Sequence, residues 1–389
     1  MNMEFIVSRN SLLRALQHVR CAITKTEIQV FKNFVFSFES EMMTVHASNG
    51  QLWMKETIVL DKITCERRPI AIYYDDLLKP IKALDEQPLR FEVYEYQVIV
   101  HHSIGSFRLP LYWNASEFFD FKAPTPDVEA DDGWQLEYEA PCLKSILGRC
   151  NFAMAQDELR PVMNGVYFNL TDEFCDYVSS DGHKLVRVRK YRSADSSFVV
   201  NNLSFIIPYP VVKALMKVMP STGDATVQYQ KPQCRIIIDD NMTLSFNTVE
   251  GIYPAYWSVI PNSHNFKMTI DRKALIKSCD RLSLFASTNN LVKMTIDKTS
   301  MKIEAEDFDF SLAGDETLPC ECEPFDGRSQ ISLRIGMKAV YVSQTLKVLS
   351  TEKVTFLFLD QSQVVLIQPQ PQPDNEEITM LLMPMLCND

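Results

Sequence analysis

Apolar residues recur with a helical period at six places along the chain, and these places form two sets of three. The first set is SRNSLLRALQHVR (8–20), PCLKSILGRCNFAM (141–154) and DRKALIKSCDRLSLF (271–285). The second set is YYDDLLKPIKALDE (73–86), PYPVVKALMKVMP (208–220) and GMKAVYVSQTLKVLSTEK (336–353). Each follows the i, i+3/i+4, i+7 spacing of an amphipathic helix. Pro80 should kink or shorten the helix that contains it.

Alternating apolar and polar residues surround these helices and predict strands. Each helix of the second set is followed by a hairpin-like stretch: LRFEVYEYQVIVHH (89–102), ATVQYQKPQCRIIIDD (225–240) and KVTFLFLDQSQVVLIQ (353–368). The second helix of each pair begins 66 to 69 residues after the first, in all three cases. This threefold repeat predicts an α+β fold of three similar domains, each with two helices and antiparallel strands. We expect the domains to cover residues 1–126, 127–262 and 263–389.

Composition narrows the class of protein. The chain is 46% hydrophobic and 23% charged, as in ordinary globular proteins. No apolar run approaches the roughly 20 residues that span a bilayer, and MNMEFIVSRN lacks the basic start of a signal peptide. The ten cysteines form no CxxC pair, so we interpret them as reduced thiols of a cytoplasmic protein. We find no HExxH, GxSxG or P-loop motif and no cluster of metal ligands, which predicts no metal and no cofactor.

Charge is distributed unevenly. The net charge is −11, yet the six helical windows hold 16 basic and 7 acidic residues. Some basic residues recur one turn apart, such as Lys213 and Lys217, or Lys273, Lys277 and Arg281, and so share a helix face. This face is either simply solvated or a positive surface for phosphates. The second interpretation predicts binding to the phosphate backbone of a nucleic acid, without sequence preference.

The segment YVSSDGHKLVRVRK (177–190) holds the most conspicuous polar residues. Asp181 and His183 could form half of an acid–base system. Such a system needs a nucleophile, metal or substrate pocket in suitable geometry, and the sequence has none of the catalytic or metal-binding motifs that would supply one. Asp181-Gly182 between two strand-like runs is instead a strong signal for a tight hairpin. The segment is therefore predicted to be a turn, and catalysis is a weaker alternative.

Four motifs, in order along the threefold repeat, resemble the bacterial DNA polymerase III beta subunit (sliding clamp) family. They are FAMAQDELRPVMNGVYF (152–168), SSDGHKLV (179–186), VEGIYPAYWSVIP (249–261) and LLMPML (381–386). The second is similar to the family's TDGHRLA and the fourth to its VVMPMR. The resemblance implies three domains per chain and a head-to-tail homodimer of six domains. Such a ring encircles duplex DNA, has no catalytic activity and tethers polymerases and repair proteins to the DNA.

The resemblance also implies three groups of site residues. The first is a peptide-binding pocket between the second and third domains: Met163, Gly182, His183, Lys184, Leu185, Pro254, Val259, Leu381, Leu382, Met383, Pro384, Met385 and Leu386. The second faces DNA: Lys25, Lys79, Lys82, Arg149, Arg160, Lys213, Lys217 and Lys277. The third forms the dimer interface: Phe107, Leu109, Leu284 and Phe285. Leu386 and Ser258 stand where the family commonly has arginine, so we expect an unusually apolar pocket.

The partners implied are the DNA polymerase III catalytic subunit, the clamp loader, translesion polymerases, and mismatch repair and ligase proteins. All would bind through short apolar clamp-binding peptides. Asp75 and Asp76 lie where the family often has basic residues. A clamp-like scaffold protein without a DNA-sliding role therefore remains the alternative.

Overall fold

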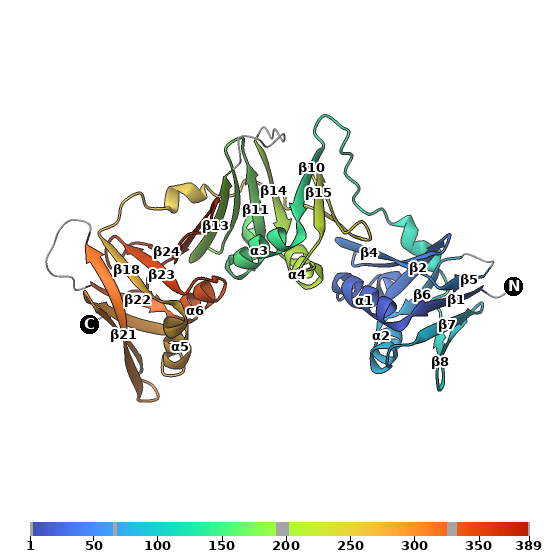
Figure 1. Ribbon diagram of the computed structural model, residues 1–389, viewed down its shortest axis with the longest axis horizontal. Helices are drawn as coiled ribbons and strands as arrows, with labels where there is room; N and C mark the ends of the chain where they lie inside the picture. Colours follow the sequence, from blue (N-terminus) through green and yellow to red (C-terminus); the bar gives the residue numbers. More distant parts are fainter. Residues whose placement is uncertain (1–2, 65–67, 192–201, 325–332, 388–389) are drawn as a thin grey trace. The chain divides into compact units, whose positions relative to one another are not determined.

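The computed structural model describes residues 3–64, 68–191, 202–324 and 333–387 (Figure 1). The chain forms two compact units, one of residues 1–144 with 210–248 and one of residues 145–209 with 249–389. Within the described ranges, no helix is both long and apolar enough to cross a membrane.

The first unit contains two antiparallel sheets. One has five strands, in the order β5 (Lys62–Ile63), β1 (Met3–Ser8), β7 (Pro88–Val93), β8 (Gln97–His102) and β9 (Gly105–Pro110). The other has eight, in the order β10 (Trp134–Glu139), β15 (Asp224–Gln230), β16 (Gln233–Ile238), β17 (Met242–Asn247), β4 (Leu52–Val59), β3 (Met42–Ser48), β2 (Asn33–Glu39) and β6 (Ile70–Tyr73).

The second unit is built on one sheet of twelve strands. Its first five are β14 (Leu203–Pro208), β11 (Gly165–Leu170), β12 (Phe174–Ser180), β13 (Lys184–Tyr191) and β25 (Glu376–Leu382). The sheet continues with β24 (Val365–Gln370), β23 (Lys353–Phe358), β18 (Phe266–Asp271), β21 (Leu312–Pro324), β20 (Ser300–Asp307), β19 (Leu291–Ile296) and β22 (Leu333–Lys338).

All six predicted helices are present. They are α1 (Arg9–Val19), α2 (Tyr74–Ala83), α3 (Ala140–Cys150), α4 (Tyr209–Val218), α5 (Arg272–Leu282) and α6 (Ala339–Lys347). The predicted apolar faces are buried: Leu12 and Leu16 of α1 and Leu275 of α5 are fully inaccessible to solvent. Helix α2 continues through Pro80 and ends three residues later, so this helix is shorter than its apolar pattern.

The threefold repeat is visible in the backbone hydrogen bonds. In each repeat the first residue of the first helix donates its N–H to a carbonyl in the loop that follows the second helix. The three bonds are Arg9 to Gln87 (2.9 Å), Ala140 to Gly223 (2.8 Å) and Arg272 to Glu352 (2.9 Å). The same connection thus closes each pair of helices, and the predicted α+β class of repeated domains is confirmed. The predicted boundaries of the three domains stay a prediction.

A cation on the first helix also binds the carboxyl end of the second helix in each repeat. The Arg9 guanidinium donates to the Ile81 and Lys82 carbonyls at 2.9 and 2.8 Å. Lys144 Nζ donates to the Met219 carbonyl at 2.6 Å. The third repeat uses Arg272, as described below. Helix C-termini carry unpaired carbonyls and partial negative charge, which explains the cation at this place.

Two strand pairings join successive repeats. Strand β17 pairs with β4 in the first unit, and β25 pairs with β13 in the second. In both, the last strand of one repeat pairs with an edge strand of the repeat before it, since β4 and β13 otherwise pair only with β3 and β12 among the described strands. We call these pairings the β4–β17 joint and the β13–β25 joint; each forms part of a continuous sheet.

Candidate functional site

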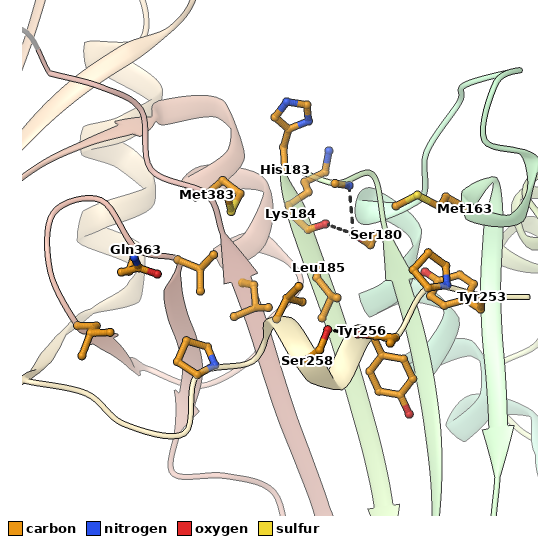
Figure 2. Close-up of a pocket in the computed structure, with 18 residues that line it drawn as sticks. Met163, Ser180, His183, Lys184, Leu185, Tyr253, Tyr256, Ser258, Gln363 and Met383 are labelled. Atoms are coloured by element: carbon orange, nitrogen blue, oxygen red, sulfur yellow. Dashed lines mark hydrogen bonds between the residues drawn. The ribbon is translucent and has the colours of Figure 1, made fainter.

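A mainly apolar cavity lies in the second unit, at the β13–β25 joint (Figure 2). Its volume is about 550 Å³. Its walls are the hairpin between β12 and β13, the loop before β18, and the end of β25 together with the loop between β23 and β24. Met163 of the 3₁₀ helix η5 (Pro161–Met163) also lines it. Leu185 and Leu381, cross-strand neighbours in the joint, form its floor together with Tyr253 and Tyr256.

The hairpin is held by Asp181 and Gly182, as the sequence predicts. The Asp181 Oδ1 accepts the backbone N–H groups of His183 and Lys184, both at 2.9 Å. Gly182 has φ +89°, a conformation that glycine adopts without strain. The Asp181 Oδ2 accepts from Lys184 Nζ at 2.5 Å. This carboxylate therefore shapes the turn rather than activating a reactant.

The charge of Asp181 is stabilised within this turn. Burial alone would raise its pKa, but the Lys184 ammonium and the two backbone donors outweigh burial, so the pKa of Asp181 lies below its ordinary value. Lys184 Nζ also lies 4.3 Å from the ring centroid of Tyr341. His183 projects from the turn at the cavity rim (Figure 2). No group of three or more metal-ligating side chains is found among the described residues. The nearby Ser180 hydroxyl donates to the Lys184 carbonyl at 2.9 Å and so closes the turn.

The second wall is the 3₁₀ helix η6 (Tyr256–Val259), anchored by a buried ion pair beneath it. The Tyr256 hydroxyl donates to Asp176 Oδ2 at 2.6 Å and accepts from Asn169 at 3.0 Å. Asp176 is fully buried and bound by both Arg189 donors at 2.7 Å. A buried carboxylate needs such a partner, and here the pair fixes the orientation of Tyr256 at the cavity.

The third wall brings in residues far along the chain. Leu359, Gln363 and Val364 come from the loop between β23 and β24. Met383 follows β25, and its backbone N–H donates to the His183 carbonyl at 2.8 Å. Val259 and Met383 are 50% and 46% exposed, which leaves two apolar side chains open to a ligand.

The structure brings most of the predicted pocket residues together. Met163, Gly182, His183, Lys184, Leu185, Pro254, Val259, Leu381 and Met383 line the cavity. It does not place Leu382, Pro384, Met385 or Leu386 in this lining. Leu382 is buried because successive side chains of a strand face opposite sides, and Leu381 takes the cavity side. After Pro384 the tail turns toward β22, where Met385 pairs with Gly336.

Sequence reasoning missed several lining residues. Tyr253, Ala255, Tyr256 and Pro261 lie inside the motif at 249–261, and Ser180 lies inside the motif at 179–186. The polar break within the third hairpin-like stretch was the only signal for Leu359, Gln363 and Val364. That break predicts a turn but not the place at which the turn packs.

The predicted DNA-facing residues lie on helices or adjoining loops, and three have acidic partners. Arg149 of α3 is largely buried and binds Glu376 at 2.7 Å. Lys79 binds Asp75 at 2.8 Å, and Arg160 binds Asp157 at 3.0 Å. Lys25, Lys82, Lys217 and Lys277 are exposed, and Lys213 is half-buried. The exposed residues remain the stronger candidates for contact with DNA.

The predicted interface residues occupy two separate places. Phe107 and Leu109 lie on β9, the edge strand of the five-stranded sheet. Leu284 and Phe285 follow α5 and are 75% and 38% exposed. Their role in an interface stays a prediction.

Comparison with protein families gives two matches. Residues 137–255 match the central domain of the DNA polymerase III beta subunit, and residues 257–386 match its C-terminal domain. Together the two matches cover well over half of the chain.

Individual relatives agree with this result. The beta sliding clamp of Staphylococcus aureus is 22% identical over 98% of this chain and 99% of its own length. That of Staphylococcus epidermidis is 26% identical over 67% of this chain and 66% of its own length. The sliding clamp of Pseudomonas aeruginosa bound to griselimycin superposes with a TM-score of 0.86, at 20% identity over the whole of both chains. The beta subunit of Thermotoga maritima gives the same score at 20% identity, over 99% of this chain and 100% of its own.

Proposed function

The chain belongs to the DNA polymerase III beta subunit family, the beta sliding clamps, and on this premise we propose that it encircles duplex DNA as a homodimeric ring. It is a processivity subunit and not an enzyme. In this proposal the cavity of Figure 2 holds short apolar peptides of partner proteins. The observation that carries the proposal is that this cavity opens on the face of its sheet opposite to the helices.

The two faces are distinguished by strand alternation. In the second unit Arg149 of α3 binds Glu376 of β25, which puts Glu376 on the helix side. Leu381 is an odd number of residues away and faces the cavity. In the first unit Arg14 and His18 of α1 bind Glu56 of β4, so Glu56 marks the helix side there. One face of each sheet is therefore available to partners while the helices face DNA.

The charge distribution supports DNA inside the ring. The helical windows are basic within a chain of net charge −11. Exposed Lys82, Lys217 and Lys277 lie on three of these helices. Lysines that meet phosphates bind the DNA backbone irrespective of sequence, as sliding requires.

Closure into a ring follows from the two joints. The last strand of the second repeat pairs with β4, and that of the third pairs with β13. Two strands in equivalent positions form no such joint among the described strands. One is β9, the last strand of the first repeat, which is equivalent to β17 and β25 and pairs only with β8. The other is the first half of β21, which is equivalent to β4 and β13 and pairs only with β20. We infer that β9 of one copy pairs with β21 of another. This contact is head-to-tail, and two such contacts close a dimer.

The apolar cavity suits many partners. Met163 and Met383 supply adaptable side chains, and the leucines and Pro254 supply fixed apolar surface. We propose that the polymerase catalytic subunit, the clamp loader, translesion polymerases, and mismatch repair and ligase proteins share it. The protein would act in the cytoplasm, where replication takes place.

A peptide titration tests the pocket. Fluorescence anisotropy of a labelled QLSLF peptide should give saturable binding, with a dissociation constant on the order of micromolar. Val259→Glu should weaken it at least about tenfold, because a carboxylate then enters an apolar cavity. Val59→Glu is the matched control, since Val59 is 66% exposed on β4 in the other unit. Absence of binding, or equal loss in both variants, would refute this pocket.

A further inference from the structure

A second cavity, of about 300 Å³, lies in the first unit at the β4–β17 joint. We propose that this cavity, the β4–β17 pocket, binds an acidic peptide of a partner protein through one aromatic side chain and its flanking carboxylates. The inference extends the proposed function, because it assumes that the partner-binding face of the protein is the one opposite to the helices.

The two cavities occupy equivalent positions in the repeat. In the pocket of Figure 2, Leu185 of β13 lies opposite Leu381 of β25, which lies opposite Leu366 of β24. At the other joint, Trp53 of β4 lies opposite Ser245 of β17, which lies opposite Arg235 of β16. These two rows of three residues are counterparts, one wholly apolar and one with an aromatic residue and a cation.

The turns beside the two rows establish this equivalence. Leu185 is paired with Ser180 across the turn that contains Gly182. Trp53 is paired with Ser48 across a turn of the same length, which contains Gly50. The two glycines have φ +89° and +88°. Leu185 and Trp53 therefore occupy the same position in their respective repeats.

A 3₁₀ helix forms one wall in each of the two cavities, but its side chains differ between them. Where η6 follows β17, the 3₁₀ helix η3 (Ala115–Asp120) follows β9. Phe118 of η3 packs on Trp53, with 5.2 Å between ring centroids, and fills part of the space. Phe119 and Phe121 are 39% and 37% exposed at the opening. The smaller cavity thus accepts one flat side chain between aromatic rings.

The charged lining side chains all favour an anion. Lys55, Lys122 and Arg235 line the cavity, and its described lining contains no aspartate or glutamate. Arg235 Nε has no hydrogen-bond partner among the described atoms. His46 stays neutral at physiological pH, because burial and nearby Lys55 lower its pKa to about 4. Three cations without a lining carboxylate, in a chain of net charge −11, complement an acidic ligand.

The orientation of the pocket favours a peptide over nucleic acid. Trp53 and Lys55 lie an odd number of residues from Glu56, which binds Arg14 and His18 of α1. Their side chains therefore project from the face opposite to the helices. That face carries the pocket for partner peptides in the other unit, whereas DNA is assigned to the helices.

The test uses a fluorescein-labelled peptide GSEEFEESG and the full-length protein. We expect saturable binding that is weakened at least about tenfold in the double variant Lys55→Glu/Arg235→Glu, as loss of a complementary charge pair predicts. Phe119→Ala should also weaken binding, and GSKKFKKSG should not bind. Lys62→Glu is the control, since Lys62 is exposed on β5 outside the cavity. Circular dichroism melting verifies that each variant is folded.

The QLSLF peptide separates this inference from the proposed function. QLSLF should bind the variant Lys55→Glu/Arg235→Glu as tightly as it binds the parent protein. Likewise, GSEEFEESG should bind Val259→Glu as tightly as it binds the parent protein. If the parent protein binds GSEEFEESG but not QLSLF, the proposed peptide pocket of Figure 2 is contradicted and the inference about the β4–β17 pocket stands. The inference is overturned if GSEEFEESG does not bind or if Lys62→Glu weakens it equally. It is also overturned if a single-stranded oligonucleotide, and not the peptide, depends on Lys55 and Arg235.

Discussion

At the scale of the residue, His46 illustrates how burial decides charge. Its Nε2 lies 2.8 Å from the Ser37 hydroxyl, and its ring contacts Phe119 with 5.3 Å between centroids. Burial, and then the charge of Lys55, lower its pKa from 6.5 to about 4. The folded protein therefore holds this imidazole neutral in a pH range where the unfolded chain would protonate it.

This shift predicts how stability depends on pH. Above pH 6.5 neither state binds the proton, and the contribution of His46 is constant. Between pH 6.5 and about 4 the unfolded state binds a proton that the folded state does not. The free energy of unfolding therefore decreases as the pH is lowered through this range, by at most about 3 kcal/mol. His46→Gln should lose part of this acid destabilisation in urea unfolding at pH 7.5 and 4.5. An unchanged difference between the two pH values would show that His46 titrates normally.

The same scale shows how far sequence could define the pocket. The Asp181-Gly182 turn follows from a local pattern, because its neighbours in sequence determine it, whereas Val259 was predicted only from the family resemblance. Leu382 was misplaced because only the register of β13 with β25 shows which residue of a pair faces the cavity. Arg189 and Asp176 were missed because their pairing with Tyr256 joins distant parts of the chain.

At the scale of the element, the repeated pair of helices is the unit that sequence predicts best. Helical periods and buried faces are local, so the six helices were placed within a few residues. The strand order of the two large sheets was not predicted, because joining β17 to β4 or β25 to β13 requires contacts between repeats. The capping of each second helix by a cation was likewise invisible in the sequence.

That capping predicts unequal costs for two arginines of α5. Arg272 is buried and donates to the Thr351 and Leu346 carbonyls at 2.5 and 3.1 Å. Arg272→Met should lower the free energy of unfolding by about 2 kcal/mol, since these carbonyls lose their donor. Arg281→Met is the matched control, because Arg281 is exposed and pairs with Glu316 at the surface. It should cost less than about 1 kcal/mol, and equal costs in urea titration would contradict the capping role.

At the scale of the whole molecule, the two strand joints predict how copies assemble. The unpaired edge of β9 carries Phe107, which stacks on His102 with 4.7 Å between centroids. Exposed strand edges with apolar side chains favour pairing with another chain. The joints within one chain thus predict an equivalent pairing between copies at β9.

Phe107→Glu should therefore dissociate the homodimer. Sedimentation should show twice the monomer mass for the parent protein and the monomer mass for the variant, because glutamate would be buried in the interface. Val59→Glu should remain dimeric, because Val59 lies on β4 and not on β9 or the first half of β21. A variant that keeps the dimer mass would place the interface elsewhere.

Topological retention on DNA tests the central claim most directly. The protein is threaded onto a linear duplex attached to a bead at one end, and the free biotinylated end is then blocked with streptavidin. A ring should stay bound through a wash in about 1 M salt, where phosphate contacts are screened, and leave once a restriction enzyme cuts the duplex. Phe107→Glu should not be retained. Release by salt despite the blocked end, or retention after cutting, would contradict a clamp that encircles DNA.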